Sequence, residues 1–433
     1  MRYQLLEDWL AWQEHSHPVE IDLGLERVGQ VLTNMALRES DALVISVAGT
    51  NGKGSCVAML ESILTQAGLS VGSYTSPHLL TYNERIRIDG KSATDKDICD
   101  AFEYIDNARG DISLSYFEFG TLAAIYLFRQ ENVDIALYEV GLGGRLDAVN
   151  ILDADIAVIT SVDIDHVAWL GSDRGTIAVE KAGIFRKRKI AVCGDLDIPP
   201  SIVDKADALG TTLYQINQDF RYEIQCSGAP GNQKSWRWES GLRMFDNLPI
   251  PGLVGDFQLT NAATVLMVIT LISDGFDISD RHVVDGLKSV SLSGRFQRVG
   301  TSPEVIVDVA HNPKSVQLLA NTLAEIPCKG VTIAVFAVMA DKDIEGILET
   351  LINKIDSWYI ADLDTERAAS AADVRKKLDN LQVANPVVAF KSVRDAYQQA
   401  LSDAEPNDRI IAFGSFFTVA EVLQLSTDTG FVD

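Results

Sequence analysis

The residues best suited to chemistry lie in segment 49–55, which reads GTNGKGS. Glycines let the backbone approach a phosphate closely, and successive N–H groups at the start of a following helix can cradle the anion. Lys53 adds a positive charge. The segment departs from the usual P-loop, because Gly54 stands where Ser or Thr normally follows the lysine and the hydroxyl comes at Ser55. We expect this loop to bind nucleotide phosphates; the alternative is a glycine-rich turn that only caps a helix.

Acidic and histidine side chains follow two other apolar runs. Glu139 ends the run 134–138, and Asp163, Asp165 and His166 follow the run 156–162. Because ligands of open α/β sheets bind at the carboxyl ends of strands, a carboxylate placed there is a natural magnesium ligand. The structural alternatives are a glutamate that faces solvent and a histidine with no chemical role. We expect Glu139 and His166 to lie at one level of the sheet, near the phosphate loop.

Polar turns of the same kind recur in the last third of the chain. Segment 304–307 runs into Asp308 and His311, and small polar loops follow later apolar runs at 341–343 and 414–418. Asn312 and Pro313 have the residue types of an N-cap and a first helical position, so capping is an alternative that does not exclude a binding role.

The segment around Lys181 carries no such signal. It reads as the end of an amphipathic helix, which predicts a solvated lysine.

The elements that must position these residues form two α/β series. In the first series, apolar runs typical of buried parallel strands alternate with helical patterns. The expected strands are 43–48, 135–140 and 156–162, and the expected helices are 55–67 and 117–130. Segment 220–244 has Gly, Asn and Pro between short stretches of alternating pattern, which predicts a small appended antiparallel sheet or hairpin. It holds the Trp236/Trp238 pair and precedes an apolar helix at 260–273. The second series has expected strands at 304–309, 331–338, 357–361, 386–390 and 409–413, with helices between them. We expect an α/β protein with two domains, residues 1–295 and 296–433.

Composition excludes several classes of protein. The chain has 433 residues, 47% of them apolar, and a net charge of −24 from 37 Lys and Arg against 61 Asp and Glu. Such acidity argues against nucleic acid and against an anionic membrane surface as partners. The five cysteines form no C-x-x-C motif, and the amino-terminal segment lacks the features of a signal peptide. We expect a cytoplasmic protein without a membrane span.

Twelve motifs, in this order, resemble those of the folylpolyglutamate synthase/dihydrofolate synthase family of the Mur ligase superfamily. They span nearly the whole chain: IDLGLERV (21–28), VAGTNGKGS (47–55), SPHL (76–79), ERIRI (84–88), ISLSYFEFGTLAA (112–124), EVGLGGRLDA (139–148), EKAGIF (180–185), NAAT (261–264), SGRFQ (293–297), DVAHNP (308–313), DKD (341–343) and GSFFTV (414–419). The resemblance implies a P-loop-containing, Mur-ligase-like domain, a smaller Rossmann-like C-terminal domain and an active site between them. It also implies a reaction: ATP phosphorylates a carboxylate of a pterin substrate, and the amino group of L-glutamate attacks the acyl phosphate to give an amide.

The resemblance implies roles for individual residues. By this resemblance, the ATP phosphates are expected to bind to Thr50, Asn51, Gly52, Lys53, Gly54 and Ser55. Further nucleotide contacts are expected from Asn261, Arg295, Asp308 and His311. The resemblance implies that Ser76, Glu139 and His166 bind two magnesium ions, and that Lys181 matches a carbamylated lysine. The expected catalytic residues are Lys53, His166 and Lys181. The residues that the resemblance implies for dihydropteroate binding are Glu20, Ile21, Asp22, Leu23, Ser115, Tyr116, Phe117, Glu118, Leu146, Asp147 and Ala148.

The segments that match the dihydropteroate site favour the bifunctional form, which acts on 7,8-dihydropteroate and on reduced folates, as a monomer. A synthase that acts only on folates is the alternative, and a cell-wall Mur ligase fits less well because SYFEFG and DVAHNP match the folate branch. A P-loop kinase or GTPase would need no second α/β domain. The intact Lys53, Glu139 and His166 count against a non-catalytic nucleotide-binding module.

Overall fold

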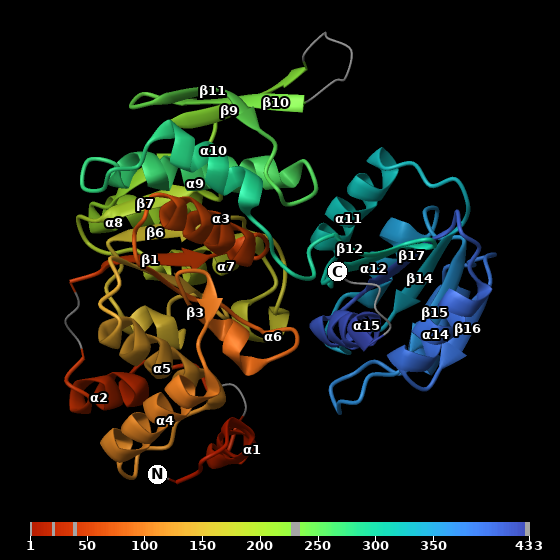
Figure 1. Ribbon diagram of the computed structural model, residues 1–433, viewed down its shortest axis with the longest axis horizontal. Coiled ribbons are helices and arrows are strands. Elements are labelled where there is room, and N and C mark those ends of the chain that lie inside the picture. The colour runs from red at the N-terminus through yellow and green to blue at the C-terminus, as the bar shows by residue number, and fades with distance from the viewer. Residues whose placement is uncertain (1, 20–21, 38–40, 227–233, 429–433) are drawn as a thin grey trace. The chain divides into compact units, whose positions relative to one another are not determined.

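The computed structural model describes residues 2–19, 22–37, 41–226 and 234–428. The chain divides into two compact units (Figure 1). The first comprises Met1–Gly252 and Gln258–Val290, and the second comprises Leu253–Phe257 and Ser291–Asp433. The sequence places the domain boundary after residue 295 and gives no sign that 253–257 belongs with the second unit.

An eight-stranded sheet forms the centre of the first unit, in the order β4-β3-β2-β5-β1-β6-β7-β8. Its strands are β1 (Leu43–Ala48), β2 (Val71–Tyr74), β3 (Ile86–Ile88), β4 (Lys91–Ser92), β5 (Ile135–Glu139), β6 (Ile156–Ile159), β7 (Ile190–Cys193) and β8 (Thr212–Gln215). Six neighbouring strands, β2, β5, β1, β6, β7 and β8, run parallel, whereas β3 and β4 extend the sheet beyond β2 in antiparallel pairs. The buried strands lack strict polar alternation because helices cover both faces. The carboxyl ends of β2, β5, β1 and β6 are therefore neighbours.

Helices cover both faces of this sheet (Figure 1). They are α1 (Leu6–Ser16), α2 (Glu26–Asn34), α3 (Lys53–Gln66), α4 (Asp95–Arg109), α5 (Tyr116–Gln130), α6 (Val167–Leu170), α7 (Arg174–Lys181), α8 (Pro200–Leu209), α9 (Phe257–Ile272) and α10 (Asp280–Ser289), with short 3-10 turns at Tyr82–Arg85, Ala148–Ile151 and Ala182–Ile184. Figure 1 shows α3, α9 and α10 on one side and α1, α2, α4 and α5 on the other. A buried aromatic cluster around Trp9, Phe102 and Phe119 packs the second group together.

The appended antiparallel sheet predicted near residues 220–244 is present. It consists of β9 (Phe220–Cys226), β10 (Lys234–Ser240) and β11 (Met244–Pro249). Trp236 and Trp238 on β10 are fully buried, and the indole of Trp238 donates a hydrogen bond to the Ala263 carbonyl on α9 (3.0 Å). The pair is therefore the packed face of this sheet, as we expect from its alternating pattern.

The second unit is a doubly wound α/β domain with a six-stranded sheet in the order β12-β13-β17-β14-β15-β16. Its strands are β12 (Gln297–Thr301), β13 (Glu304–Asp308), β14 (Thr332–Phe336), β15 (Ser357–Ala361), β16 (Val387–Phe390) and β17 (Arg409–Phe413), and its helices are α11 (Pro313–Glu325), α12 (Ile344–Leu351), α13 (Ala371–Asn380), α14 (Val393–Asp403) and α15 (Phe416–Asp428). Only β12 is antiparallel to its neighbour among these described strands. Asn312 caps α11 by accepting a hydrogen bond from the Ser315 N–H (2.8 Å), as its sequence predicts.

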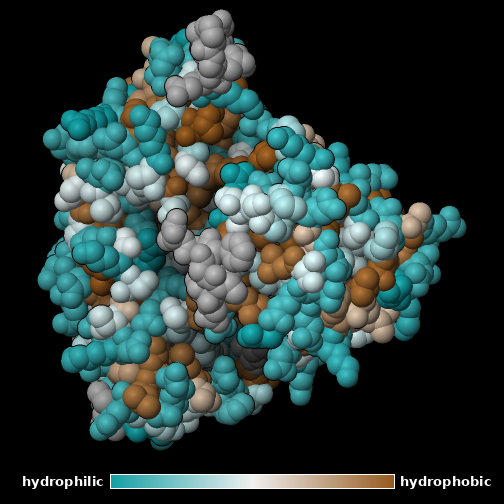
Figure 2. All heavy atoms as spheres, turned by 45° about the vertical axis from the view of Figure 1, so that its right-hand side comes forward, coloured by the Kyte–Doolittle hydropathy of each residue, from teal (hydrophilic) through white to brown (hydrophobic). Residues whose placement is uncertain are grey.

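On the face that Figure 2 shows, apolar residues form separate small groups among polar ones. Scattered apolar residues of this kind are ordinary for a soluble fold and mark no interface by themselves. No helix within the described residues is long and apolar enough to cross a membrane.

Candidate active site

The phosphate loop lies between β1 and α3, and the segment after β6 holds its shape. Thr50 N–H donates to the Ser161 carbonyl (2.8 Å), and Thr50 Oγ1 both donates to the Asp163 carbonyl (3.0 Å) and accepts from the Asp163 N–H (2.9 Å). The Thr160 hydroxyl donates to the Asn51 carbonyl (2.7 Å). These hydrogen bonds fix the shape of the loop, which reduces the entropy lost when it binds an anion.

Gly52 is the N-cap of α3 and lies in the left-handed region, with φ +88°, a conformation that a side chain disfavours. A Cβ there would lie 2.5 Å from Asn261 Oδ1, so the loop and α9 are in close contact. Asn261 Nδ2 donates to Gln258 Oε1 (2.8 Å), and Gln258 Nε2 donates to Ser55 Oγ (3.3 Å). Asn261, more than 200 positions from the loop in sequence, is therefore its neighbour in the fold. Lys53 Nζ donates to the Gly49 carbonyl within the same loop (3.1 Å).

Glu139 and Ser76 meet at the carboxyl ends of β5 and β2. Glu139 is 6% exposed, and its Oε2 accepts a hydrogen bond from the Ser76 N–H (3.3 Å). The solvated strand-end glutamate considered as an alternative is therefore wrong, because neighbouring strands enclose the carboxylate.

His166 is the N-cap of α6, with φ +52°, and has a partly exposed side chain. Asp165 precedes it and accepts from the His166 N–H through Oδ1 (2.8 Å).

The described part of the chain holds no group of three or more His, Cys, Asp or Glu side chains arranged to bind a metal. One buried carboxylate and one serine from adjacent strands still fit Mg²⁺, which usually keeps several waters and shares substrate phosphates instead of filling its shell from the protein.

Lys181 is buried at the end of α7, with 3% exposure. The solvated lysine that its segment predicts is wrong, because the glycine-rich loop after β5 packs against this turn. The Arg145 N–H donates to the Glu180 carbonyl (2.9 Å), and a Cβ at Gly144 would lie 2.9 Å from the Lys181 carbonyl oxygen. Burial first, and the nearby Lys53 cation second, lower the pKa of Lys181 to about 7, against a smaller opposite effect of Asp165.

Asp147 is a second buried ionisable group near Lys53. Its carboxylate accepts hydrogen bonds from the Leu142 N–H (2.9 Å) and the Val149 N–H (3.0 Å). Burial raises its pKa to about 6, although these N–H groups and Lys53 oppose the change. A Cβ at Gly141 would lie 2.8 Å from the Phe117 ring and 3.3 Å from Asp147 Oδ2. The segments around 115–118 and 146–148 therefore meet at Gly141.

The other residues expected at the acceptor lie around the start of α5. Ser115 caps this helix, Glu118 is buried, and Arg27 pairs with both Asp22 and Glu118. Tyr116 and Phe117 are half-buried, Ala148 is buried, and Leu146 and Leu23 are intermediate in exposure. Glu20 and Ile21 lie outside the described residues. Sequence reasoning missed Arg27, for which the only signal is its place in the LERV motif directly after the expected acceptor segment.

In the second unit, three expected residues gather at the ends of β13 and β17. Asp308 accepts hydrogen bonds from the N–H groups of Phe296 and Ala310 (both 2.8 Å). Burial raises the pKa of Asp308, although the Arg295 cation opposes this. The centre of the Phe416 ring lies 5.4 Å from the Arg295 guanidinium and 6.2 Å from the centre of the His311 ring. Phe416, which sequence reasoning did not single out, joins the two.

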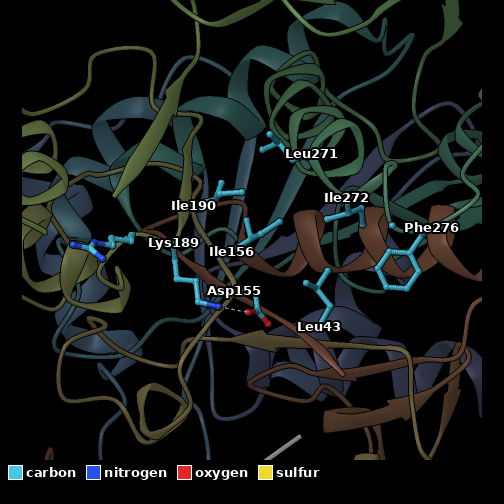
Figure 3. A pocket seen from close by; sticks show the side chains of 10 residues that line it. Leu43, Asp155, Ile156, Lys189, Ile190, Leu271, Ile272 and Phe276 are labelled. Atoms are coloured by element: carbon cyan, nitrogen blue, oxygen red, sulfur yellow. Dashed lines mark hydrogen bonds and ion pairs between the residues drawn. The ribbon is translucent and has the colours of Figure 1, made fainter. Parts of the chain in front are cut away.

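A pocket of about 360 Å³ lies elsewhere in the first unit (Figure 3). Leu43, Ile156 and Ile190 line it at the amino ends of β1, β6 and β7, opposite the ends that carry the expected site residues. At its rim Lys189 pairs with Asp155 (2.7 Å). None of the expected site residues lines this pocket, so it is separate from the phosphate loop.

Family models match both units. The model "Mur ligase middle domain" matches residues 47–269, and "Mur ligase, glutamate ligase domain" matches residues 294–416. The fold and the phosphate loop thus define a Mur ligase, an ATP-dependent ligase.

Individual relatives narrow the family. The dihydrofolate synthase/folylpolyglutamate synthase of Escherichia coli K12 is 42% identical over 420 residues, which cover 97% of this chain and 95% of that protein. The structure of E. coli FolC in complex with DHPP and ADP matches with a TM-score of 0.91 at 42% identity, over 99% of each chain. A bifunctional folylpolyglutamate synthase/dihydrofolate synthase with Mn, AMPPNP and L-glutamate bound matches with a TM-score of 0.88 at 44% identity, over 98% of each chain. The chain belongs to the dihydrofolate synthase/folylpolyglutamate synthase family.

Proposed function

We propose that this ligase joins L-glutamate to 7,8-dihydropteroate and further glutamates to reduced folates, through an acyl phosphate. The observation that carries the proposal is that three features lie at the carboxyl ends of the first unit's parallel strands. They are the phosphate loop after β1, Glu139 at the end of β5 and the buried Lys181, which packs against the loop after β5. The relatives that bind a nucleotide analogue, L-glutamate and DHPP support this choice of substrates. A folate-only synthase is the second candidate, since the two activities differ only in the acceptor.

The residues of the loop bind and orient the nucleotide in this proposal. N–H groups at the start of α3 and the Lys53 ammonium face the phosphates and stabilise the charge that moves during phosphoryl transfer. Transfer of the γ-phosphoryl group to the acceptor carboxylate gives it a leaving group. The glutamate amine then attacks the carbonyl carbon, and phosphate leaves. Positioning the amine beside the acyl phosphate supplies much of the rate, because it removes the entropy cost of a bimolecular encounter.

We propose two Mg²⁺ ions, with Ser76 and Glu139 at the first and His166 at the second. A bound divalent ion would neutralise phosphate charge. A relative that holds Mn supports the use of a divalent ion, while Mg²⁺ itself, the number of ions and their ligands are part of the proposal.

Lys181 is proposed to carry a carbamate. Carbamylation needs an unprotonated amine, and burial gives Lys181 a substantial unprotonated fraction near neutral pH because its pKa is about 7. The carbamate would replace a cation, which opposes a nearby metal ion, with an anion.

Arg295, Asp308 and His311 are proposed as nucleotide contacts of the second unit, and the enzyme is proposed to act as a monomer. The guanidinium of Arg295 suits a phosphate oxygen because of its planar fork of donors.

The test is ADP release from ATP by the purified chain, with and without L-glutamate, for each acceptor. We expect glutamate-dependent release with 7,8-dihydropteroate and with tetrahydrofolate. Release with tetrahydrofolate alone would favour the folate-only synthase. Release only with a UDP-muramoyl peptide would contradict the folate reading, and turnover that needs no glutamate would contradict amide ligation altogether.

A further inference from the structure

Arg27 joins two segments that are far apart in the sequence. It lies in the first turn of α2, and its Nη1 donates to Asp22 Oδ2 (2.6 Å). Its Nη2 donates both to the Asp22 carbonyl oxygen (3.2 Å) and to Glu118 Oε1 on α5 (3.2 Å). One guanidinium thus holds the segment before α2 against the start of α5, 91 positions later.

The partners of Arg27 are held in turn. Glu118 Oε2 accepts from the Ser115 N–H (2.7 Å), and the Ser115 hydroxyl accepts from the Glu118 N–H (3.3 Å). On the other side of the network, His17 Nε2 lies 3.0 Å from Asp22 Oδ2, and His17 Nδ1 lies 3.1 Å from Ser113 Oγ. The network therefore runs from His17 and Asp22 through Arg27 to the cap of α5.

The burial of the network makes the arginine difficult to replace. The Glu118 and His17 side chains are 3% and 7% exposed, whereas those of Arg27 and Asp22 are 29% and 35% exposed. A buried carboxylate such as Glu118 needs a partner for its charge. A planar guanidinium can serve two carboxylates and a carbonyl at fixed angles, which a lysine ammonium on a flexible stem cannot reproduce.

We propose that Arg27 is a positioning residue for the pterin acceptor, acting through Asp22 and Ser115 rather than by touching the reacting atoms. The inference rests on the proposed function and on the residues expected at the acceptor, of which Asp22, Leu23 and Ser115–Glu118 are among the described residues. Both Arg27 and His17 contact the same oxygen of Asp22, Oδ2, so the protein itself fixes the orientation of this carboxylate. A slack network would misplace both segments at once, and a shift of about 1 Å can cost on the order of 100-fold in rate.

The test compares Arg27→Lys with Arg109→Lys. Arg109 is a matched control because it also joins a carboxylate to a carbonyl, through Asp106 (2.6 and 2.8 Å) and Ile112 (2.9 Å), in the same unit but in no expected acceptor segment. Steady-state ADP release gives KM for 7,8-dihydropteroate, tetrahydrofolate and ATP, and thermal melting gives the stability of each variant. We expect Arg27→Lys to lower kcat/KM for the acceptors roughly 10- to 100-fold, with a higher acceptor KM. KM for ATP should stay within about twofold, and Arg109→Lys should leave every KM at the wild-type value.

Three results would overturn the inference. The first is an Arg27→Lys enzyme that melts earlier but keeps its acceptor KM, which would make the network structural only. The second is an equal rise of KM for ATP, and the third is the same KM change in Arg109→Lys. Should Arg27→Lys fail to fold, the double variant Arg27→Gln with Glu118→Gln removes both charges of the pair and is measured in the same way, with the same expected result. A wild-type enzyme that releases no ADP with either acceptor would instead contradict the proposed function itself.

Discussion

Lys181 shows how its surroundings change the chemistry of one side chain. Its local sequence is that of a surface lysine, yet the loop after β5 buries it and lowers its pKa to about 7. Buried ionisable groups with displaced pKa values are frequent at active sites, because catalysis needs charge states that water alone does not provide.

Replacing Lys181 tests its proposed role. Lys181→Met keeps most of the buried volume but removes the amine, so we expect kcat for ADP release to fall by on the order of 100-fold or more. Thermal melting should change little, because a buried amine is exchanged for an apolar side chain of similar length.

A ¹³C-bicarbonate experiment separates the carbamate from other roles of the amine. Wild-type protein should show a carbamate carbon signal by NMR that Lys181→Met lacks. Near-wild-type turnover by the variant would remove Lys181 from the catalytic set, and the absence of the signal in wild-type protein would remove the carbamate alone.

Asp147 predicts a pH effect on stability. Burial raises its pKa to about 6 in the folded protein, while an unfolded aspartate titrates near pH ~4. Between these values the folded state binds more protons than the unfolded state, so this contribution to the free energy of unfolding is complete below pH ~4 and is lost as the pH rises through about 6.

Asp147→Asn removes this titration. Between pH ~5 and ~7, the free energy of unfolding of the wild type should therefore fall relative to that of the variant by about 1 kcal/mol. Urea unfolding of both proteins measures the difference. A difference that is constant with pH, or that changes in the opposite direction, would contradict the raised pKa.

At the scale of elements, the contact between the glycine-rich loop and the end of α7 positions Lys181. A Cβ at Gly144 would lie 2.8 Å from the Glu180 carbonyl oxygen and 2.9 Å from that of Lys181, both backbone atoms that cannot move without shifting the helix end. The two segments must therefore separate if either gains a side chain here.

Gly144→Ala should destabilise the protein by about 1–3 kcal/mol through overpacking. It should also lower kcat, because Lys181 moves with its helix. Gly241→Ala is the control, since nothing lies within 4 Å of a Cβ at Gly241, and its effect should stay within about 0.5 kcal/mol. Urea unfolding and ADP release measure both effects; a Gly144→Ala enzyme as stable and active as Gly241→Ala would contradict the close contact.

At the scale of the whole molecule, each unit has a hydrophobic core of its own. Trp9, Phe102 and Phe119 belong to the core of the first unit, and Phe336, Trp358 and Phe413 belong to that of the second. Units with separate cores can unfold in separate transitions.

Two matched truncations test this independence. Phe336→Ala and Phe102→Ala each remove a fully buried ring and should each cost about 3–5 kcal/mol in their own unit. Scanning calorimetry of the full chain should show each variant lowering a different transition. If both lower one common transition by the same amount, the units unfold cooperatively and the expectation is wrong.

The net charge of −24 also belongs to this scale. ATP, glutamate and the pterin carboxylate are anions, so an evenly acidic surface would repel them. The proposed binding residues Lys53 and Arg295, with a divalent ion, must therefore reverse the local field where these ligands bind.

The sequence alone determined the features that depend on neighbours along the chain. Apolar runs gave the parallel strands, because a strand covered on both faces needs no polar alternation, and Asn312 and Pro313 gave the start of α11. The phosphate loop is equally local: glycines, one lysine and a helix start lie within seven residues. The short strands β2 to β4, β7 and β8 and the edge strand β12 were not predicted, because a few residues carry too weak a periodic signal.

Only the tertiary structure decided which distant groups meet and which are removed from water. Asn261 lies beside Gly52, Lys181 loses its solvent to the loop after β5, and Arg27 reaches Glu118 across 91 positions. The pKa values of Lys181 and Asp147 change for the same reason, since desolvation depends on all the atoms packed around a group. Residue types thus set which chemistry the chain can perform, and packing sets the charge state and position in which each side chain performs it.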